Sequence, residues 1–271
     1  MGAEAAETLP PNRPFLTTEL GLRVVSAVVM LVGVLSAAWL GGTVFTLLCV
    51  ALSCVVFYEW ERITSLTPFD GTEALLVAGF GLMMLGVVFG FFVWALAIFL
   101  VLGLVLEVTS SGPERREVRW IGLGGLYAAI PAVMLPVILA HGGFWQLLFV
   151  FLVVWAADIG GYFAGRRFGG VKLWPAVSPK KTWSGAIGGT VASAIVGGIY
   201  AAWLDAPIVV PVLAAIVLSV VSQAGDLFES AVKRRFDVKD SGAIIPGHGG
   251  VLDRVDGLIA AALVAGVVVS L

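Results

Sequence analysis

Long apolar runs, separated by short polar segments, constrain this chain more than any other feature. A run of about 20 apolar residues suffices to span a bilayer as a helix, and the sequence contains many such runs. Hydrophobic residues make up 59% of the 271 residues and charged residues only 13%, whereas a soluble domain is about 25% charged. We therefore predict an all-α, polytopic membrane helical bundle that forms one domain, residues 1–271.

The apolar runs predict about nine transmembrane helices. The stretch 74–106 is apolar throughout and too long for one helix, so we divide it at a turn near Gly90. We expect the first helix to act as an uncleaved signal, because no cleavage site follows a basic segment at the N-terminus. The predicted spans are 24–40, 43–58, 74–90, 91–106, 121–140, 144–162, 184–204, 207–230 and 257–271.

The distribution of basic residues predicts the orientation of these spans. If the N-terminus is cytoplasmic, all 16 Lys and Arg residues fall in inside segments or at inside helix ends, as the positive-inside rule requires. Removing one span would place half of them on the wrong side. We predict a cytoplasmic N-terminus and an outside C-terminus. Basic loops that only orient the protein would explain this asymmetry, but not the specific residues below.

A carboxylate stripe precedes the most polar loop of the chain. Ser222, Asp226, Glu229, Ser230 and Lys233 are three or four residues apart at the inner end of span 207–230, so they share one helix face. Carboxylates within a span are costly and usually face a cavity. The alternative is a purely structural Asp226–Lys233 pair that faces the bundle.

Two further carboxylates, Asp253 and Asp256, lie three residues apart where the last span begins. If the last two spans pack together, Asp226 meets both of them at one membrane depth. Such oxygen ligands suit Mg²⁺, and two ions would bridge the attacking and leaving oxygens of a displacement at phosphorus. Helix capping is the alternative role for Asp253.

Between the carboxylates lies a polar loop that is suited to phosphate. Its glycines allow backbone N–H groups to point at an anion, and His248 could donate to a phosphate or orient a ligand. The candidate phosphate-binding residues of this loop and its flanks are Lys233, Arg234, Lys239, Asp240, His248, Gly249, Gly250 and Arg254.

A second basic segment, Ser178-Pro179-Lys180-Lys181-Thr182, precedes span 184–204. Hydroxyls and ammonium groups at a helix N-terminus make a phosphate seat; the alternative is an anchor for anionic lipid headgroups. Nearby Asp158 is an intramembrane carboxylate. It is a candidate metal ligand, ribose or base contact, or partner for Lys180 or Lys181.

These residues resemble the signature of bacterial phosphatidate cytidylyltransferases (CDP-diacylglycerol synthases). The resemblance covers roughly residues 155–257, and Ser184 departs from it where the family has Glu. The first half of the chain is similar only as hydrophobic spans. The matching stretch reads Ser230-x-Val232-Lys233-Arg234-x4-Lys239-Asp240-x-Gly242-x2-Ile245-Pro246-x-His248-Gly249-Gly250-x2-Asp253-Arg254-Val255-Asp256.

The resemblance implies a CTP-dependent nucleotidyltransferase of phospholipid biosynthesis in the cell inner membrane. CTP and phosphatidate would give CDP-diacylglycerol and pyrophosphate, with Mg²⁺ at one of two cation sites and a divalent or monovalent ion at the other. The membrane lipid is then both partner and substrate. A homodimer is expected, and a nucleic-acid partner is not expected. Helices of 1–140 would provide scaffold, lipid or dimer contacts, and 141–271 the catalytic helices and cytoplasmic loops.

The resemblance also assigns roles to individual residues. Asp226, Asp253 and Asp256 would bind metal, with Asp158 and Glu229 as further candidates. Ser178, Lys180, Lys181 and Thr182 would hold the lipid or the nucleotide phosphate. The residues expected to act in catalysis are Asp226, Lys233, Lys239, His248 and Asp253.

Three other classes remain open at this stage. A transporter would use Asp158 and Asp226 as ion sites, but the polar residues gather at one membrane face. A CDP-alcohol phosphotransferase would show its own aspartate pattern, which is missing after Asp256-Gly257. A non-catalytic lipid-binding scaffold would tolerate the loss of Asp226.

Overall fold

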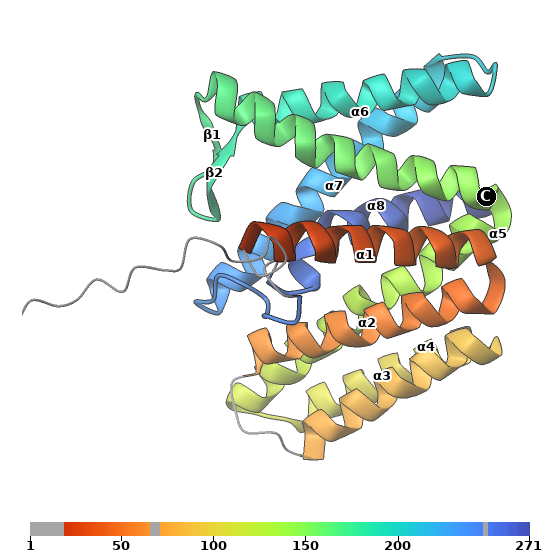
Figure 1. Cartoon of the computed structure of the whole chain (residues 1–271). Helices are drawn as coiled ribbons and strands as arrows, with labels where there is room; N and C mark the ends of the chain where they lie inside the picture. The colour runs from red at the N-terminus through yellow and green to blue at the C-terminus, as the bar shows by residue number, and fades with distance from the viewer. Residues whose placement is uncertain (1–18, 66–70, 246–248) are drawn as a thin grey trace, which may run out of the picture.

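The computed structural model describes residues 19–65, 71–245 and 249–271, and in this part of the chain it is a helical bundle with one small hairpin (Figure 1). The prediction of an all-α bundle is confirmed apart from this hairpin. The helices are α1 (Glu19–Leu40), α2 (Gly42–Thr64), α3 (Gly71–Phe89), α4 (Phe92–Thr109), α5 (Gly112–Phe168), α6 (Trp183–Trp203), α7 (Val209–Arg235) and α8 (Leu252–Ser270), and the strands are β1 (Lys172–Trp174) and β2 (Ser178–Thr182).

Length and composition make this a multi-pass membrane protein. Six of the described helices, α2 to α7, are long and apolar enough to cross a bilayer, and α1 contains a shorter apolar helix, Val24–Leu40. Large apolar side chains such as Phe89, Val93 and Trp94 are exposed on the outside of the bundle. Such a surface suits lipid and not water, because bilayer tails are as apolar as these side chains.

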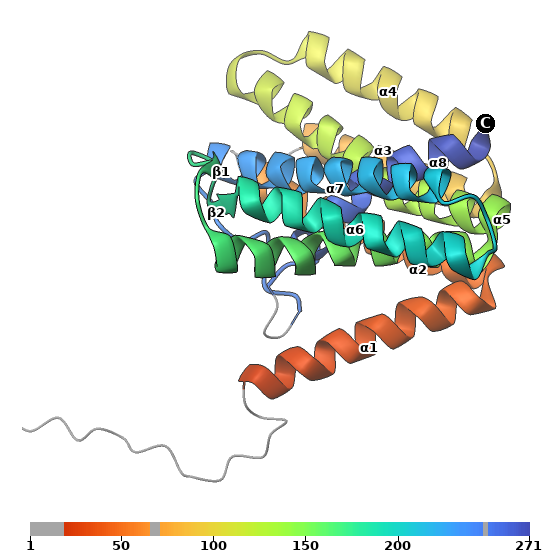
Figure 2. The same ribbon diagram turned by 90° about the horizontal axis from the view of Figure 1, so that it is seen from above.

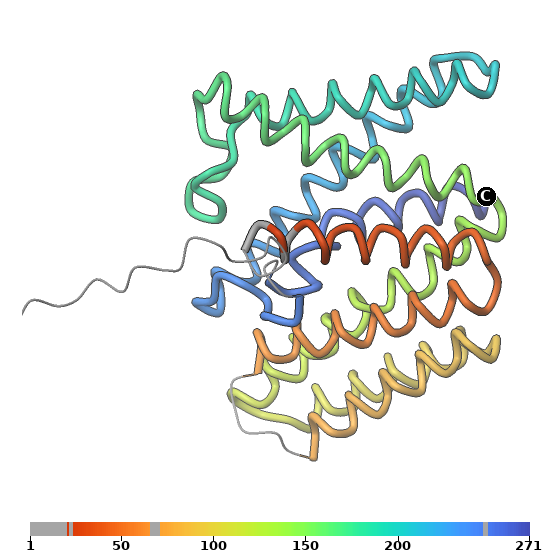
Figure 3. The backbone as a smooth tube through the Cα atoms, in the orientation of Figure 1, coloured from red at the N-terminus to blue at the C-terminus, as the bar shows by residue number. Residues whose placement is uncertain are grey.

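Glycines with positive φ lie at two of the sharp reversals within the apolar stretches. Gly90 has a φ of 82° and separates α3 from α4, which confirms the predicted turn within 74–106. Gly143 has a φ of 73° and a ψ of 179° and breaks the long helix α5. Figure 3 shows that the chain reverses direction within α5, whose two arms diverge from this turn. Only glycine enters such left-handed conformations without strain.

Helix α5 also extends beyond the predicted spans at both of its ends. Residues 112–120 were expected to be a loop, but they are helical, with a proline in the first turn where its missing N–H costs no bond. The second arm continues to Phe168 before the β-hairpin begins. The first arm packs against α2 and α8, and the second arm packs against α6 (Figures 1 and 2).

Small residues allow the second arm of α5 to lie directly against α6. A Cβ placed on Gly189 would lie 2.5 Å from the carbonyl oxygen of Ala157, and one on Gly160 would lie 2.6 Å from the Cβ of Ala192. Side chains at these glycines would force the helices apart. Such close approach through small residues is typical of helix contacts in membranes.

The polar connections gather at one end of the bundle. Figure 1 shows the start of α1, the β-hairpin and the loop between α7 and α8 at this end, whereas the C-terminus lies at the opposite end. The turns after α1, α3 and α6 also lie at the opposite end. We call the end that holds the start of α1, the β-hairpin and the α7–α8 loop the polar end.

Candidate functional site

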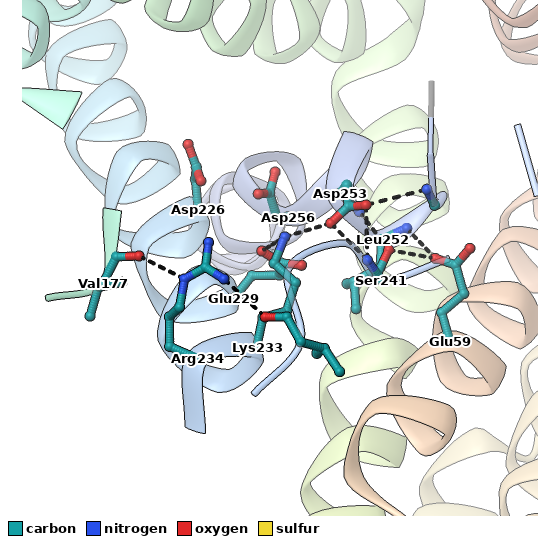
Figure 4. A network of polar contacts seen from close by, with 12 residues as sticks. Glu59, Val177, Asp226, Glu229, Lys233, Arg234, Ser241, Leu252, Asp253 and Asp256 are labelled. Carbon is teal, nitrogen blue, oxygen red and sulfur yellow. Dashed lines mark hydrogen bonds and ion pairs between the residues drawn. The ribbon is translucent and has the colours of Figure 1, made fainter. Parts of the chain in front are cut away.

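The predicted stripe on α7 forms at the polar end. Ser222 and the Glu229 and Lys233 side chains are buried, and the Asp226 side chain is 30% exposed. Figure 4 shows Asp226, Glu229 and Lys233 on the side of α7 that faces α8. The three-to-four-residue spacing therefore places these groups together, as predicted.

Lys233 joins two carboxylates and does not pair with Asp226. Its Nζ lies 2.8 Å from Oε2 of Glu229 and 2.5 Å from Oδ1 of Asp253. Glu229 comes from the previous turn of α7, and Asp253 comes from the first turn of α8. The buried ammonium therefore connects two helices. The alternative of a structural Asp226–Lys233 pair is wrong.

Asp253 caps the loop that leads into α8. Its Oδ2 accepts hydrogen bonds from the backbone N–H groups of Ser241, at 3.0 Å, and Gly250, at 3.2 Å. Burial alone raises the pKa of the Asp253 carboxyl, but the hydrogen bond and charge of Lys233, with the bonds from Ser241, hold that pKa below its ordinary value. Asp253 is therefore ionised at neutral pH. Both of its sequence-based roles, ligand and cap, remain compatible with this position.

Asp226 and Asp256 face the same space from α7 and α8 (Figure 4). The charges of Asp226, Glu229 and Asp158 all act on the Asp256 carboxyl, and the Gly257 N–H donates to Oδ1 of Asp256 at 2.7 Å. Asp253 instead turns toward Lys233 and Ser241. The predicted meeting of three aspartates is thus divided into a pair, Asp226 and Asp256, with Asp253 beside it.

Two glycines explain why the pair forms. A Cβ on Gly225 would lie 2.8 Å from the carbonyl oxygen of Asp256, and a Cβ on Gly257 would lie 2.7 Å from Oγ of Ser222. The helices α7 and α8 therefore touch backbone to backbone at this depth. Each aspartate follows or precedes one of these glycines, so both carboxylates lie at the level of the contact.

No three His, Cys, Asp or Glu side chains come close enough together to hold a metal ion by themselves in the described part of the chain. Mg²⁺ that binds a phosphate substrate uses only one or two protein carboxylates and completes its shell with phosphate oxygens and water. Asp226 supplies such oxygens at the wall of a cavity, and Asp256 supplies them from the neighbouring helix. Metal binding by Asp226, Asp253 and Asp256 stays a prediction.

A cavity of about 410 Å³ opens between the second arm of α5, β2, α6 and α7. Lys181 forms an ion pair with Asp226 across it, and Gln223 donates to Oγ1 of Thr190 at 3.2 Å in its wall. The cavity is thus lined by carboxylates from α5 and α7 and by ammonium groups from β2. The polar residues that line it include Asp158, Lys180, Lys181, Thr182, Gln223 and Asp226.

The second basic segment is a β-strand and not the start of a helix. Strand β2 pairs with β1, and its last residue, Thr182, caps α6 by accepting the Gly185 N–H at 3.1 Å. Ser184, which departs from the family pattern, donates to the carbonyl oxygen of Gly169 at 2.5 Å. The hairpin is therefore closed onto α6. Lys181 reaches Asp226 from this short sheet, and Lys180 also lines the cavity.

The other predicted phosphate ligands occupy the rim of the polar end. Arg234 donates to the carbonyl oxygen of Val177 at 3.4 Å and links α7 to the β-hairpin. Lys239, Asp240 and Arg254 are exposed. His248 lies outside the described residues.

Sequence reasoning missed Glu59 of α2, which is 1% exposed and contacts the loop before α8. The signal for it was a carboxylate at the inner end of span 43–58, at the same membrane depth as the predicted aspartates. It was passed over because it lies in the half of the chain that the resemblance described only as hydrophobic spans.

Comparison with known proteins gives a consistent result over most of the chain. The model of the Cytidylyltransferase family matches residues 21–271. Proteins named phosphatidate cytidylyltransferase from Brucella suis biovar 1 and Brucella melitensis biotype 1 are 43% identical over 262 residues, which cover 90% of this chain and 91% of each relative. The protein of that name from Bacillus subtilis is 45% identical over 119 residues, 43% of this chain and 44% of its own length.

Proposed function

This chain belongs to the cytidylyltransferase family, and from that premise we propose that it transfers a cytidylyl group from CTP to phosphatidate, giving CDP-diacylglycerol and pyrophosphate. Relatives that match nine-tenths of the chain carry the name of this activity. The observation that carries the proposal is the cavity beside Asp226, which is lined by the carboxylates Asp158 and Asp226 and by Lys180 and Lys181.

The proposed reaction is an in-line displacement at phosphorus. An oxygen of the lipid phosphate attacks the α-phosphorus of CTP, a new P–O bond forms, and the bond to the β-phosphate breaks to release pyrophosphate. A phosphate monoester has a second pKa near 6, so the attacking oxygen is already ionised at neutral pH. No strong general base is needed, and catalysis depends on alignment and charge neutralisation.

We assign cation binding to Asp226 and Asp256, with Asp253 as a third ligand and Asp158 and Glu229 near them. The oxygen-only donors and the space beside them fit Mg²⁺, which would neutralise phosphate charge when bound. A second cation, divalent or monovalent, would share these carboxylates.

Cationic side chains of the polar end would hold the phosphates. Lys181, which lines the cavity and is partly exposed, would exchange its contact with Asp226 for a phosphate oxygen. Lys233, which is buried between Glu229 and Asp253, is the further candidate for phosphate binding. Ser178, Lys180 and Thr182 would bind beside Lys181. The triphosphate and the leaving pyrophosphate would be bound by residues of the α7–α8 loop and its flanks, namely Arg234, Lys239, Asp240, His248, Gly249, Gly250 and Arg254.

We propose nine spans, a cytoplasmic N-terminus and an outside C-terminus in the inner membrane. Helix α5 contributes two of the spans because it reverses at Gly143. This orientation directs the polar end toward the cytoplasm, from which CTP comes, and toward the inner leaflet, which holds phosphatidate. A homodimer is part of the same proposal and is tested by measuring the mass of the protein in detergent.

The test of the proposed function is pyrophosphate release by the purified protein in detergent. The reaction contains CTP, phosphatidate and Mg²⁺, and parallel reactions omit each one or replace CTP by ATP, UTP or GTP. Release is expected only with all three, and D226N is expected to abolish it while folding is retained. The control D205N changes an aspartate in the turn between α6 and α7, at the opposite end of the bundle.

One result would overturn the proposed reaction, and another would overturn only the cation assignment. If the folded protein releases no pyrophosphate with any nucleotide, the proposed enzymatic activity is wrong. Coupled ion flux in proteoliposomes would then support a transporter. If D226N releases pyrophosphate as fast as the wild type, the assignment of cation binding to Asp226 is wrong, but the proposed reaction still stands.

A further inference from the structure

Glu59 lies at the inner end of α2, far from the catalytic half of the chain in sequence, yet it contacts the start of α8. Its Oε1 accepts the Val251 N–H at 2.9 Å, and its Oε2 accepts the Leu252 N–H at 2.7 Å. Helix α8 begins at Leu252 and has no capping bond from its own preceding residue. Glu59 therefore caps α8 from another helix, with a charge that suits the positive end of the helix dipole.

The same carboxylate also holds the loop that carries the N–H donors to Asp253. The Ser241 hydroxyl donates to Oε2 of Glu59 at 3.1 Å, and the Ser241 N–H donates to Oδ2 of Asp253 at 3.0 Å. Ser241 is thus bonded to both carboxylates at once (Figure 4). A displacement of Glu59 would move Ser241, and with it one of the groups that fix the Asp253 side chain.

Two glycines show how closely the loop surrounds Glu59. A Cβ on Gly242 would lie 2.7 Å from Oε1 of Glu59, and a Cβ on Gly250 would lie 2.8 Å from Oε2 and would overlap the Ser241 hydroxyl. Both positions approach the carboxylate with bare backbone. The loop therefore has room for this carboxylate and for no side chain at either glycine.

Both oxygens of Glu59 accept hydrogen bonds, so the carboxamide of glutamine cannot replace the carboxylate. A Gln amide nitrogen has two N–H donors and no acceptor, and it would face a backbone N–H or the Ser241 hydroxyl. One buried donor would lose its partner, although the side chain would keep its volume. The site thus requires the charge and both acceptors, and not only the size, of Glu59.

We propose that Glu59 is a positioning residue for the proposed cytidylyl transfer: it sets the start of α8 and, through Ser241, the direction of the Asp253 carboxylate. This inference rests on the proposed function for its effect on rate, but its structural part stands independently. The N-terminal helices then do more than form a scaffold, because α2 supplies one of the supports of the catalytic loop.

The experiment compares E59Q with E61Q in the purified full-length protein. Glu61 lies on the same helix and accepts a hydrogen bond from Ser65, away from this loop, so the pair is matched in chemistry and position. Two measurements are made on each: pyrophosphate release as a function of Mg²⁺, CTP and phosphatidate, and hydrogen exchange of segments 241–245 and 249–253 without substrate.

E59Q is expected to lower kcat about 10- to 100-fold and to raise the Mg²⁺ concentration at half-maximal rate, as the loss of a group that orients a metal ligand does. Hydrogen exchange of the two segments is expected to be faster in E59Q than in the wild type, and to be the same in E61Q as in the wild type. S241A is expected to show a smaller change in the same two measurements, because it removes only the shared hydroxyl.

The two readouts separate this inference from the proposed function. Wild-type protein without activity would sink the proposed function, while faster exchange in E59Q would still support the positioning of the loop. Exchange and kinetics of E59Q that equal those of E61Q would overturn the inference. If E59Q does not yield folded protein, S241A decides: wild-type exchange and kinetics in S241A would also overturn it.

Discussion

Lys233 donates a 2.5 Å hydrogen bond to Asp253 and thereby joins the end of α7 to the first turn of α8. The two side chains are only 11% and 9% exposed. A charge pair so buried is costly to break from one side, because the remaining charge keeps its desolvation penalty. The same ammonium also contacts Glu229, so removing it leaves two buried carboxylates.

Replacement of Lys233 by methionine should therefore destabilise the protein as well as inactivate it. Removal of one partner of a buried pair costs about 3–5 kcal/mol, and thermal unfolding in detergent should show a clear fall in the midpoint for K233M. R235M is the control, since Arg235 also ends α7 but is exposed. Equal unfolding midpoints for K233M and R235M would contradict a supporting role for the Lys233 bonds.

Replacement of Lys181 by alanine should mainly weaken substrate binding. Lys181 lines the cavity and pairs with the partly exposed Asp226, so its loss removes a charge-assisted contact worth about 1.5–3 kcal/mol to a phosphate. This corresponds to a rise of about 10- to 100-fold in the KM of the substrate whose phosphate it binds. Steady-state kinetics with CTP and phosphatidate varied in turn would identify that substrate.

The control for K181A is K172A, because Lys172 lies on the partner strand of the same hairpin and is exposed. K172A should leave both KM values unchanged. If K181A raises neither KM, Lys181 does not bind a substrate phosphate.

The hydropathy and charge patterns were enough to predict the helices and the polar end. Gly90 and Gly143 lie where the predicted spans were divided, since a reversal in an apolar stretch requires a residue that tolerates positive φ. The stripe on α7 was predictable for a similar reason, because residues three and four apart on a helix always share a face. These features depend on local sequence alone.

Contacts between distant segments could not be predicted in this way. Asp253 turns to Lys233, while Asp256 faces Asp226 (Figure 4), and this choice depends on how α8 is rotated against α7. The helix rotation is set by the contact of Gly225 with Gly257, which no periodicity encodes. Glu59 reaches partners that are 182 to 193 residues away in sequence, so its role required the tertiary structure.

Substitution of Gly225 by alanine should disturb the aspartate pair without touching a charge. The added methyl group would lie 2.6 Å from the Cβ of Ala260 and 2.8 Å from the carbonyl oxygen of Asp256, so α7 and α8 must separate. Overpacking of this kind costs about 1–3 kcal/mol. Activity of G225A should fall together with its unfolding midpoint.

G103A serves as the control for G225A, since nothing lies within 4 Å of a Cβ at Gly103 of α4. G103A should retain full activity and stability. Wild-type activity in G225A would show that the α7–α8 contact does not set the geometry of the aspartates.

The lowered pKa of Asp253 predicts how stability depends on pH. Burial works against this lowering, but the bond and charge of Lys233 and the bonds from Ser241 outweigh it. The folded state therefore holds the ionised form more strongly than the unfolded state does. The resulting stabilisation is complete above the ordinary pKa of 3.8 and is lost as the pH falls through the lowered value.

The prediction is measured as the difference in unfolding midpoint between the wild type and D253N. This difference should be present at pH 5, where both states of the wild type hold Asp253 ionised, and should shrink below about pH 4. D237N provides the comparison, because Asp237 is exposed in the turn after α7, and it should match the wild type throughout. A difference for D253N that grows on acidification would mean that the Asp253 carboxyl is held protonated in the fold, and not ionised by Lys233.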